Sequence, residues 1–232
     1  LRDDGKAHQI RVDNPQSKHH GQTRREVLQW NHAAPLGTKM HDRIDRFLSM
    51  REEDLKDYTA SHLHLFDKFC QPDDTVEEKV IFHQFIGVLR DFYKNGWRPF
   101  RTEWRVWFKV GDQIVAGSID CVMVRTLPSG AKEYAVLDWK RTDKPLNSVF
   151  PKAPPFLPFP LDKYPNCTLN QYGFQVELYR WILSNYYGIQ VPETYIIQLK
   201  PAKTDRALPN IFKIPDMQVD IQRCVDVYLQ TQ

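Results

Sequence analysis

The sequence predicts an α/β fold with a central mixed β-sheet flanked by helices. Helical periodicity dominates the first part of the chain, and strict alternation of apolar and polar residues follows at 100–140. Beyond residue 167 the predicted order is helix, strand, helix, which adds crossover connections to an antiparallel meander. We therefore expect a polar N-terminal arm at 1–22 and a single domain at 23–232.

The first helix of the domain is expected to begin near residue 38. Pro35 and Gly37 break regular structure, and Thr38 is a suitable N-cap. An apolar face with helical spacing follows, made by Met40, Ile44, Phe47 and Leu48. His41 lies beside that face, so the pattern alone leaves it either a packed core residue or a ligand.

Two further helices are predicted before the strands. One covers 52–70 and ends in a turn at 71–74. The next begins with the capping pattern Thr75-Val76-Glu77-Glu78 and ends at Gly96.

Three strands at hairpin spacing are predicted at 100–110, 114–124 and 133–140. Alternation places Asp138 and Lys140 on one face of the third strand, and Asp120 on the corresponding face of the second. We therefore expect Asp120, Asp138 and Lys140 to point into one pocket.

The segment at 143–167 carries seven prolines, which exclude a helix or a central strand. We interpret this insertion as an ordered wall packed on the domain, with a lid over the pocket as the alternative. A helix capped by Thr168 or Asn170 then runs to about 187, and a strand at 194–200 and a helix at 216–230 complete the fold.

Composition sets limits on the function. A net charge of +3 permits a nucleic-acid partner without arguing for one, and no apolar run is long enough to span a membrane. The opening residues lack a signal-peptide pattern, and a start at Leu1 fits a piece of a longer protein with further domains. The four isolated cysteines fit reduced thiols, so we expect an intracellular, reducing compartment (cytoplasm, nucleus or a viral replication site).

The acidic residues suit the hydrolysis of a phosphodiester. Asp120 and Asp138 offer hard oxygen ligands for Mg²⁺ or Mn²⁺, and the backbone carbonyl of Trp139 can add another. Lys140 would then stabilise the charge that develops on the phosphate. On the following helix, Gln171, Gln175 and Tyr179 form one polar row at four-residue spacing. Candidate phosphate contacts beside the pocket are Arg141, Lys144 and Arg180.

The ordered motifs are Gly37-Thr38-x-x-His41, Gly117-x-x-Asp120, Asp138-x-Lys140 and Gln175-x-x-x-Tyr179. Together they resemble the PD-(D/E)XK nuclease superfamily over about residues 30–200, specifically its RecB-like branch, which includes lambda exonuclease and the CRISPR-associated adaptation nucleases.

The resemblance implies a restriction-endonuclease-like core. It also implies that His41 and Asp120 bind metal, that Asp138 and Lys140 are catalytic, and that Gln175 and Tyr179 contact the scissile region. Glu103 matches an accessory acid of the branch. The cysteines lack the spacing of the iron–sulfur cluster that several relatives carry, so no cluster is expected.

The sequence thus predicts a Mg²⁺- or Mn²⁺-dependent DNA nuclease that acts on single strands or duplex ends in repair, recombination or replication. Two alternatives remain. One is a divalent-metal endonuclease, including the RNA cap-cleaving kind, and the other is a non-catalytic module that binds nucleic acid.

Overall fold

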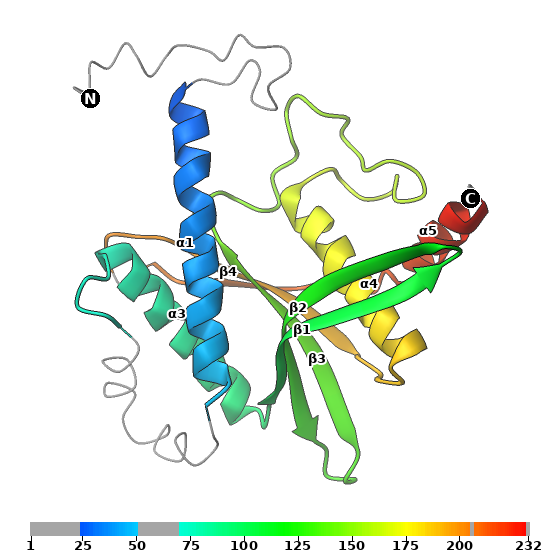
Figure 1. Ribbon diagram of the computed structural model, residues 1–232, viewed down its shortest axis with the longest axis horizontal. Coiled ribbons are helices and arrows are strands. Elements are labelled where there is room, and N and C mark those ends of the chain that lie inside the picture. The colour runs from blue at the N-terminus through cyan, green and yellow to red at the C-terminus, as the bar shows by residue number, and fades with distance from the viewer. Residues whose placement is uncertain (1–23, 51–69, 205–206, 231–232) are drawn as a thin grey trace. The chain divides into compact units, whose positions relative to one another are not determined.

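The computed structural model describes residues 24–50, 70–204 and 207–230 (Figure 1). The chain divides into two compact units, residues 1–42 and 43–232. The arm predicted at 1–22 and the helix predicted at 52–70, save its last residue, lie outside the described residues.

The described elements alternate as an α/β fold requires. The helices are α1 (Arg24–Leu48), α3 (Val76–Lys94), α4 (Thr168–Tyr186) and α5 (Gln218–Gln230). The strands are β1 (Arg98–Val110), β2 (Gln113–Thr126), β3 (Lys132–Arg141), β4 (Glu193–Leu199) and β5 (Asn210–Lys213). Among the described helices, none is both long enough and apolar enough to cross a bilayer.

Within the described residues, five strands form one sheet in the order β1-β2-β3-β4-β5. Neighbouring strands are antiparallel except β3 and β4, which pair in parallel. The α/β fold with a mixed sheet is therefore confirmed, including the β1-β2-β3 meander. The sequence analysis missed β5, because four residues are too short for a periodic signal.

The prediction that a helix begins at Thr38 is wrong. Helix α1 begins at Arg24 and continues through Pro35. The Thr38 hydroxyl donates to the Ala34 carbonyl at 3.2 Å, as a threonine inside a helix does, and so does not cap. Proline removes one helical hydrogen bond, and a helix of 25 residues keeps enough of the others to continue past it.

Helix α3 begins as predicted. The Thr75 hydroxyl accepts from the backbone N–H of Glu78, and the Glu78 carboxylate accepts from the Thr75 N–H, which completes a capping box. Helix α4 begins differently from the prediction. Its N-cap is Cys167, which makes no side-chain cap, whereas Thr168 is already helical and the Asn170 amide donates to the Pro165 carbonyl.

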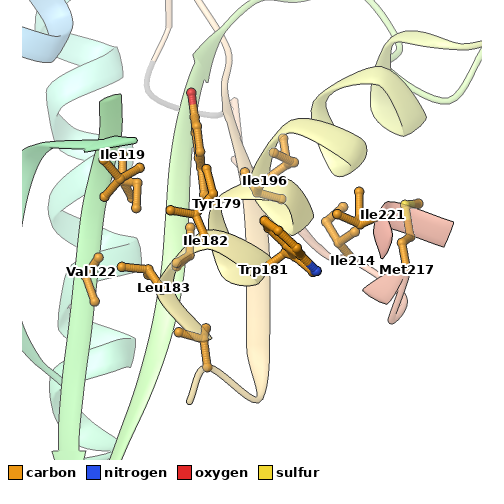
Figure 2. Packing of buried hydrophobic residues seen from close by; sticks show 14 of the residues in the cluster. Ile119, Val122, Tyr179, Trp181, Ile182, Leu183, Ile196, Ile214, Met217 and Ile221 are labelled. Atoms are coloured by element: carbon orange, nitrogen blue, oxygen red, sulfur yellow. The ribbon is translucent and has the colours of Figure 1, made fainter. Parts of the chain in front are cut away.

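Helices cover both faces of the sheet in residues 43–232. On β3, Trp139 packs edge-on against Phe85 of α3, with ring centroids 5.2 Å apart. Val136, on the opposite face, joins a buried cluster with Ile182 of α4 and Ile221 of α5. Figure 2 shows this second cluster, with side chains of α4 between β2 and the residues around α5.

The proline-rich segment packs on the domain. Leu146 and Leu161 are buried, and the Tyr164 hydroxyl donates to Asp220 of α5 at 2.7 Å. These contacts agree with the ordered wall rather than the lid.

Glu177 on α4 joins three elements through buried hydrogen bonds. Its carboxylate accepts from the Thr194 hydroxyl of β4 at 2.6 Å, the Met217 N–H at 3.1 Å and the Gln218 amide at 2.8 Å. The Glu177 side chain is fully buried, and Arg180 lies 3.3 Å from the same carboxylate. All four neighbouring groups are hydrogen-bond donors. The side chain at position 177 must therefore accept hydrogen bonds through both of its terminal oxygens.

We expect Glu177→Gln to lower the free energy of unfolding by about 2–3 kcal/mol. The NH₂ group of the glutamine would replace an accepting oxygen and would face buried hydrogen-bond donors. Chemical denaturation measures this loss. The exposed acid Asp226 on α5 provides the control, since Asp226→Asn should change stability by less than about 0.5 kcal/mol. Equal stabilities for Glu177→Gln and the wild type would refute the account of this network.

Candidate functional site

The candidate site lies where β2 separates from β3. The ladder between these strands ends at the pair Cys121 and Leu137. Beyond it, the Trp139 N–H donates to the Asp120 carboxylate at 2.8 Å rather than to the backbone of β2. Asp120 therefore lies in the opening between two strands. The N–H and C=O of a strand residue point to the same side, so the Trp139 carbonyl also faces the Asp120 side of β3.

Glu103 lies across from Asp120 on β1. Carboxylate oxygens of Glu103 and Asp120 lie within 4.8 Å of each other. The backbone of Glu103 has a φ of +43°, a left-handed conformation that residues with a Cβ rarely adopt. Strained backbone of this kind concentrates at functional sites, and here it accompanies the close approach of two acids. The Ser118 hydroxyl, 3.3 Å away, donates to Glu103.

Asp138 and Lys140 form an ion pair on one face of β3, as their spacing predicts. The Lys140 ammonium lies 2.9 Å and 2.8 Å from the two oxygens of Asp138. It also lies 4.4 Å from the centre of the Tyr172 ring on α4. Burial is the largest single influence and acts to lower the pKa of Lys140, but the charge and the hydrogen bond of Asp138, together with the charge of Asp120, raise this pKa overall. Lys140 is therefore a cation at neutral pH.

Gly117 is required by the approach of α4. A Cβ on Gly117 would lie 2.4–2.8 Å from atoms of the Tyr179 ring, which is closer than real side chains allow. Tyr179 is itself buried, and its hydroxyl accepts from the Gln175 amide at 2.8 Å. In Figure 2 this hydroxyl points away from the other labelled side chains. The glycine of Gly117-x-x-Asp120 and the tyrosine of Gln175-x-x-x-Tyr179 thus meet directly.

The remaining predicted contacts are distributed more widely. Gln171 is exposed and donates to Asn166, and Arg141 lies 3.2 Å from Glu77 of α3. The Lys144 side chain is exposed. Arg180 forms ion pairs with Glu177 and Asp216, which tie α4 to the residues before α5. The role of each as a phosphate contact stays a prediction.

His41 lies on α1. It belongs to the unit of residues 1–42, whereas the acids above belong to residues 43–232. Its role as a metal ligand therefore stays a prediction.

The donor chemistry of Glu103, Asp120 and the Trp139 carbonyl fits a hard divalent cation such as Mg²⁺ or Mn²⁺. The pKa of Asp120 rises to about 6, chiefly through burial. Lys140 and the Trp139 N–H lower it, whereas the nearby Glu103 raises it further. A cation beside these carboxylates would offset both their repulsion and the cost of burying their charge.

Sequence reasoning missed Tyr172, whose ring covers the Lys140 ammonium. A signal was present, because Tyr172 precedes Gln175 by three residues and Tyr179 by seven, which places all three on one helix face. Ser118 was also missed, and its hydrogen bond to Glu103 depends on the pairing of β1 with β2.

Comparisons with known proteins find only distant similarity to solved structures. No protein-family model and no curated protein matches the sequence. A solved structure from Eubacterium rectale, whose name carries a provisional exonuclease assignment, is 14% identical with a TM-score of 0.44, covering 85% of this chain. The chain spans 64% of that protein. The structure of SSO0001 is also 14% identical, with a TM-score of 0.31, covering 85% of this chain and 84% of SSO0001.

The Gly117 contact yields a double-mutant prediction. Gly117→Ala should lower the free energy of unfolding by about 1–3 kcal/mol, because the added methyl group must displace a buried, hydrogen-bonded ring. In the Tyr179→Ala background the same change should cost less than about 0.5 kcal/mol. Denaturant unfolding of the four proteins of this cycle measures the coupling, and additive losses would contradict the contact.

Asp120 yields a prediction for pH dependence. The pKa of Asp120 in the folded protein, about 6, exceeds its ordinary value of 3.8. The Asp120 carboxyl therefore contributes most to the free energy of unfolding when it is protonated. This contribution is complete below pH 3.8 and is lost as the pH rises through 6. Asp120→Asn removes the charge, so without metal its stability relative to the wild type should improve by about 1 kcal/mol between pH 5 and pH 8.

Denaturant unfolding in a chelator at both pH values measures this change. The matched control is Asp112→Asn in the exposed β1–β2 turn. The stability of this variant relative to the wild type should be the same at both pH values. Added Mn²⁺ at pH 8 should stabilise the wild type and leave Asp120→Asn unchanged. A difference for Asp120→Asn that is the same at pH 5 and pH 8 would contradict the buried carboxylate.

Proposed function

We propose that this chain is a metal-dependent nuclease that hydrolyses phosphodiester bonds, of the RecB-like branch of the PD-(D/E)XK superfamily. The observation that carries the proposal is the position of Asp120 where β2 separates from β3, bonded to the Trp139 N–H and close enough to interact with the Lys140 ammonium, which pairs with Asp138. A divalent metal, a carboxylate set and a cation are the groups that phosphodiester hydrolysis needs.

The residues have separate roles. Asp120, Glu103 and the Trp139 carbonyl would hold Mg²⁺ or Mn²⁺, with Asp138 beside them and His41 added by the motif resemblance. When bound, such an ion polarises the phosphate and lowers the pKa of a water molecule. The Trp139 N–H orients Asp120. Lys140 holds its charge between Asp138 and the Tyr172 ring, where it can neutralise charge that develops on the phosphate.

The proposed substrate is DNA, as single strands or duplex ends, in repair, recombination or replication. Gln175 and Tyr179 would lie beside the scissile phosphate, and candidate phosphate contacts further out are Gln171, Arg141, Lys144 and Arg180. The proposal includes no membrane partner, and the thiol form of the four cysteines is compatible with a reducing compartment.

A second candidate is an endonuclease, because nothing in the geometry of Asp120 and Lys140 requires a DNA end. Linear and closed circular DNA distinguish the two activities. A matching RNA separates a deoxyribonuclease from a ribonuclease of the cap-cleaving kind.

The test is digestion of end-labelled linear DNA, closed circular DNA and RNA with Mg²⁺, Mn²⁺ or chelator. We expect degradation of linear DNA only when metal is present. Lys140→Gln should reduce the rate by at least about 10²-fold, as loss of one charge-stabilising group does. Lys132→Gln is the matched control, because Lys132 is exposed at the other end of the same strand and should leave the rate unchanged.

Efficient cutting of closed circles would replace the exonuclease by an endonuclease. DNA binding without any hydrolysis above that of Lys140→Gln would instead identify a non-catalytic module.

A further inference from the structure

The β1–β2 hairpin has one face that no helix covers in the described residues. Alternate residues on it are packed: Val106 and Phe108 are buried in the cluster with α4, and Gly117 contacts Tyr179. The residues between them are exposed and form cross-strand pairs, namely Arg105 with Ser118, Trp107 with Ala116, and Lys109 with Ile114. We call these six residues the open face. The hairpin extends past α4 toward α5 in Figure 1.

Trp107 occupies the middle of the open face and is 54% exposed. Its cross-strand neighbour is Ala116, whose methyl group offers little apolar surface for the indole. Trp107 shares the open face with the exposed Ile114, and exposed apolar side chains gathered on one face of a protein mark binding surfaces.

Two cations flank this tryptophan. Arg105 and Lys109 are two residues away on either side, so both share its face at a spacing of about 7 Å along the strand. The Lys109 ammonium lies 4.0 Å from the Asp112 carboxylate, and both side chains are exposed. An ion pair in such a position contributes little to stability. An aromatic platform between backbone-binding cations is the arrangement that binds single-stranded nucleic acid.

Protection of the sheet edge from pairing with another chain is the competing explanation for these charges. β1 is the edge strand, and charged side chains deter edge-to-edge pairing. That explanation accounts for Arg105 and Lys109, but it disfavours a half-exposed tryptophan between them, because an exposed apolar edge promotes aggregation.

The open face leads into the candidate metal centre. At its inner end the Ser118 hydroxyl donates to Glu103, and Glu103 lies within 4.8 Å of Asp120. A strand bound along Lys109, Trp107 and Arg105 would therefore continue toward the acids. We propose that the open face binds the unpaired strand of the substrate, with one base stacked on Trp107 and phosphates beside Arg105 and Lys109. The path of the bound strand toward the acids rests on the proposed function. The open face as a surface that binds single strands does not depend on it.

The test is binding of a fluorescently labelled 12-nucleotide oligothymidylate in chelator, where no hydrolysis can occur. We expect Trp107→Ala to weaken binding about tenfold, as loss of one stacking platform does, and Trp107→Phe to weaken it less. The double variant Arg105→Gln/Lys109→Gln should reduce the dependence of affinity on salt. Blunt duplex of equal length should bind with little sensitivity to Trp107, because its bases are already stacked.

Phe159 is the matched control, an aromatic side chain of the proline-rich segment that is 69% exposed. Phe159→Ala should bind like the wild type, and thermal unfolding should show Trp107→Ala to be folded. An oligouridylate arm reports whether the face distinguishes RNA from DNA.

The outcomes distinguish the open face from the nuclease. Wild-type affinity in Trp107→Ala, or an equal loss in Phe159→Ala, would overturn the open face while leaving hydrolysis by the Lys140 site intact. Tryptophan-dependent binding without hydrolysis in metal would support the open face and refute the nuclease. Absence of any oligonucleotide binding would also overturn the open face.

Discussion

The hydrogen bond from the Trp139 N–H to the Asp120 carboxylate is the interaction on which the site depends. It forms because β2 pairs with β3 only from Cys121 onward, so that the backbone N–H of Trp139, beyond the end of this ladder, needs another acceptor inside the protein. A carboxylate fills that need, and it enters a region where burial raises its pKa to about 6. The separation of the two strands therefore supplies a carboxylate that can attract a cation.

Helix α4 holds this arrangement in place from one face of the sheet. Glu177 fixes the helix to β4 and to the start of α5 through buried donors. Tyr179 then packs on Gly117, three residues before Asp120, and Tyr172 covers the Lys140 ammonium. One helix thus contacts both strands that carry the acids, so a shift of α4 would alter Asp120 and Lys140 together.

Sequence reasoning predicted several features of the fold and site from local signals. The capping box at Thr75 and the strands of the meander follow from neighbouring residues alone, and both are confirmed. The pairing of Asp138 with Lys140 follows from alternation. The start of α1 failed for the opposite reason, because Pro35 and Thr38 carry strong local signals that a long helix overrides.

The sequence by itself determined the element types, the mixed sheet and the residue types suited to metal-assisted hydrolysis, since periodicity and side-chain chemistry are local properties. Only the tertiary structure decided that Asp120 accepts from Trp139, that Glu103 takes a left-handed backbone, and that Tyr179 excludes a side chain at Gly117. It also placed Trp107 in water between two cations. These features depend on where one segment lies relative to another, and no pattern within a single segment carries that distance.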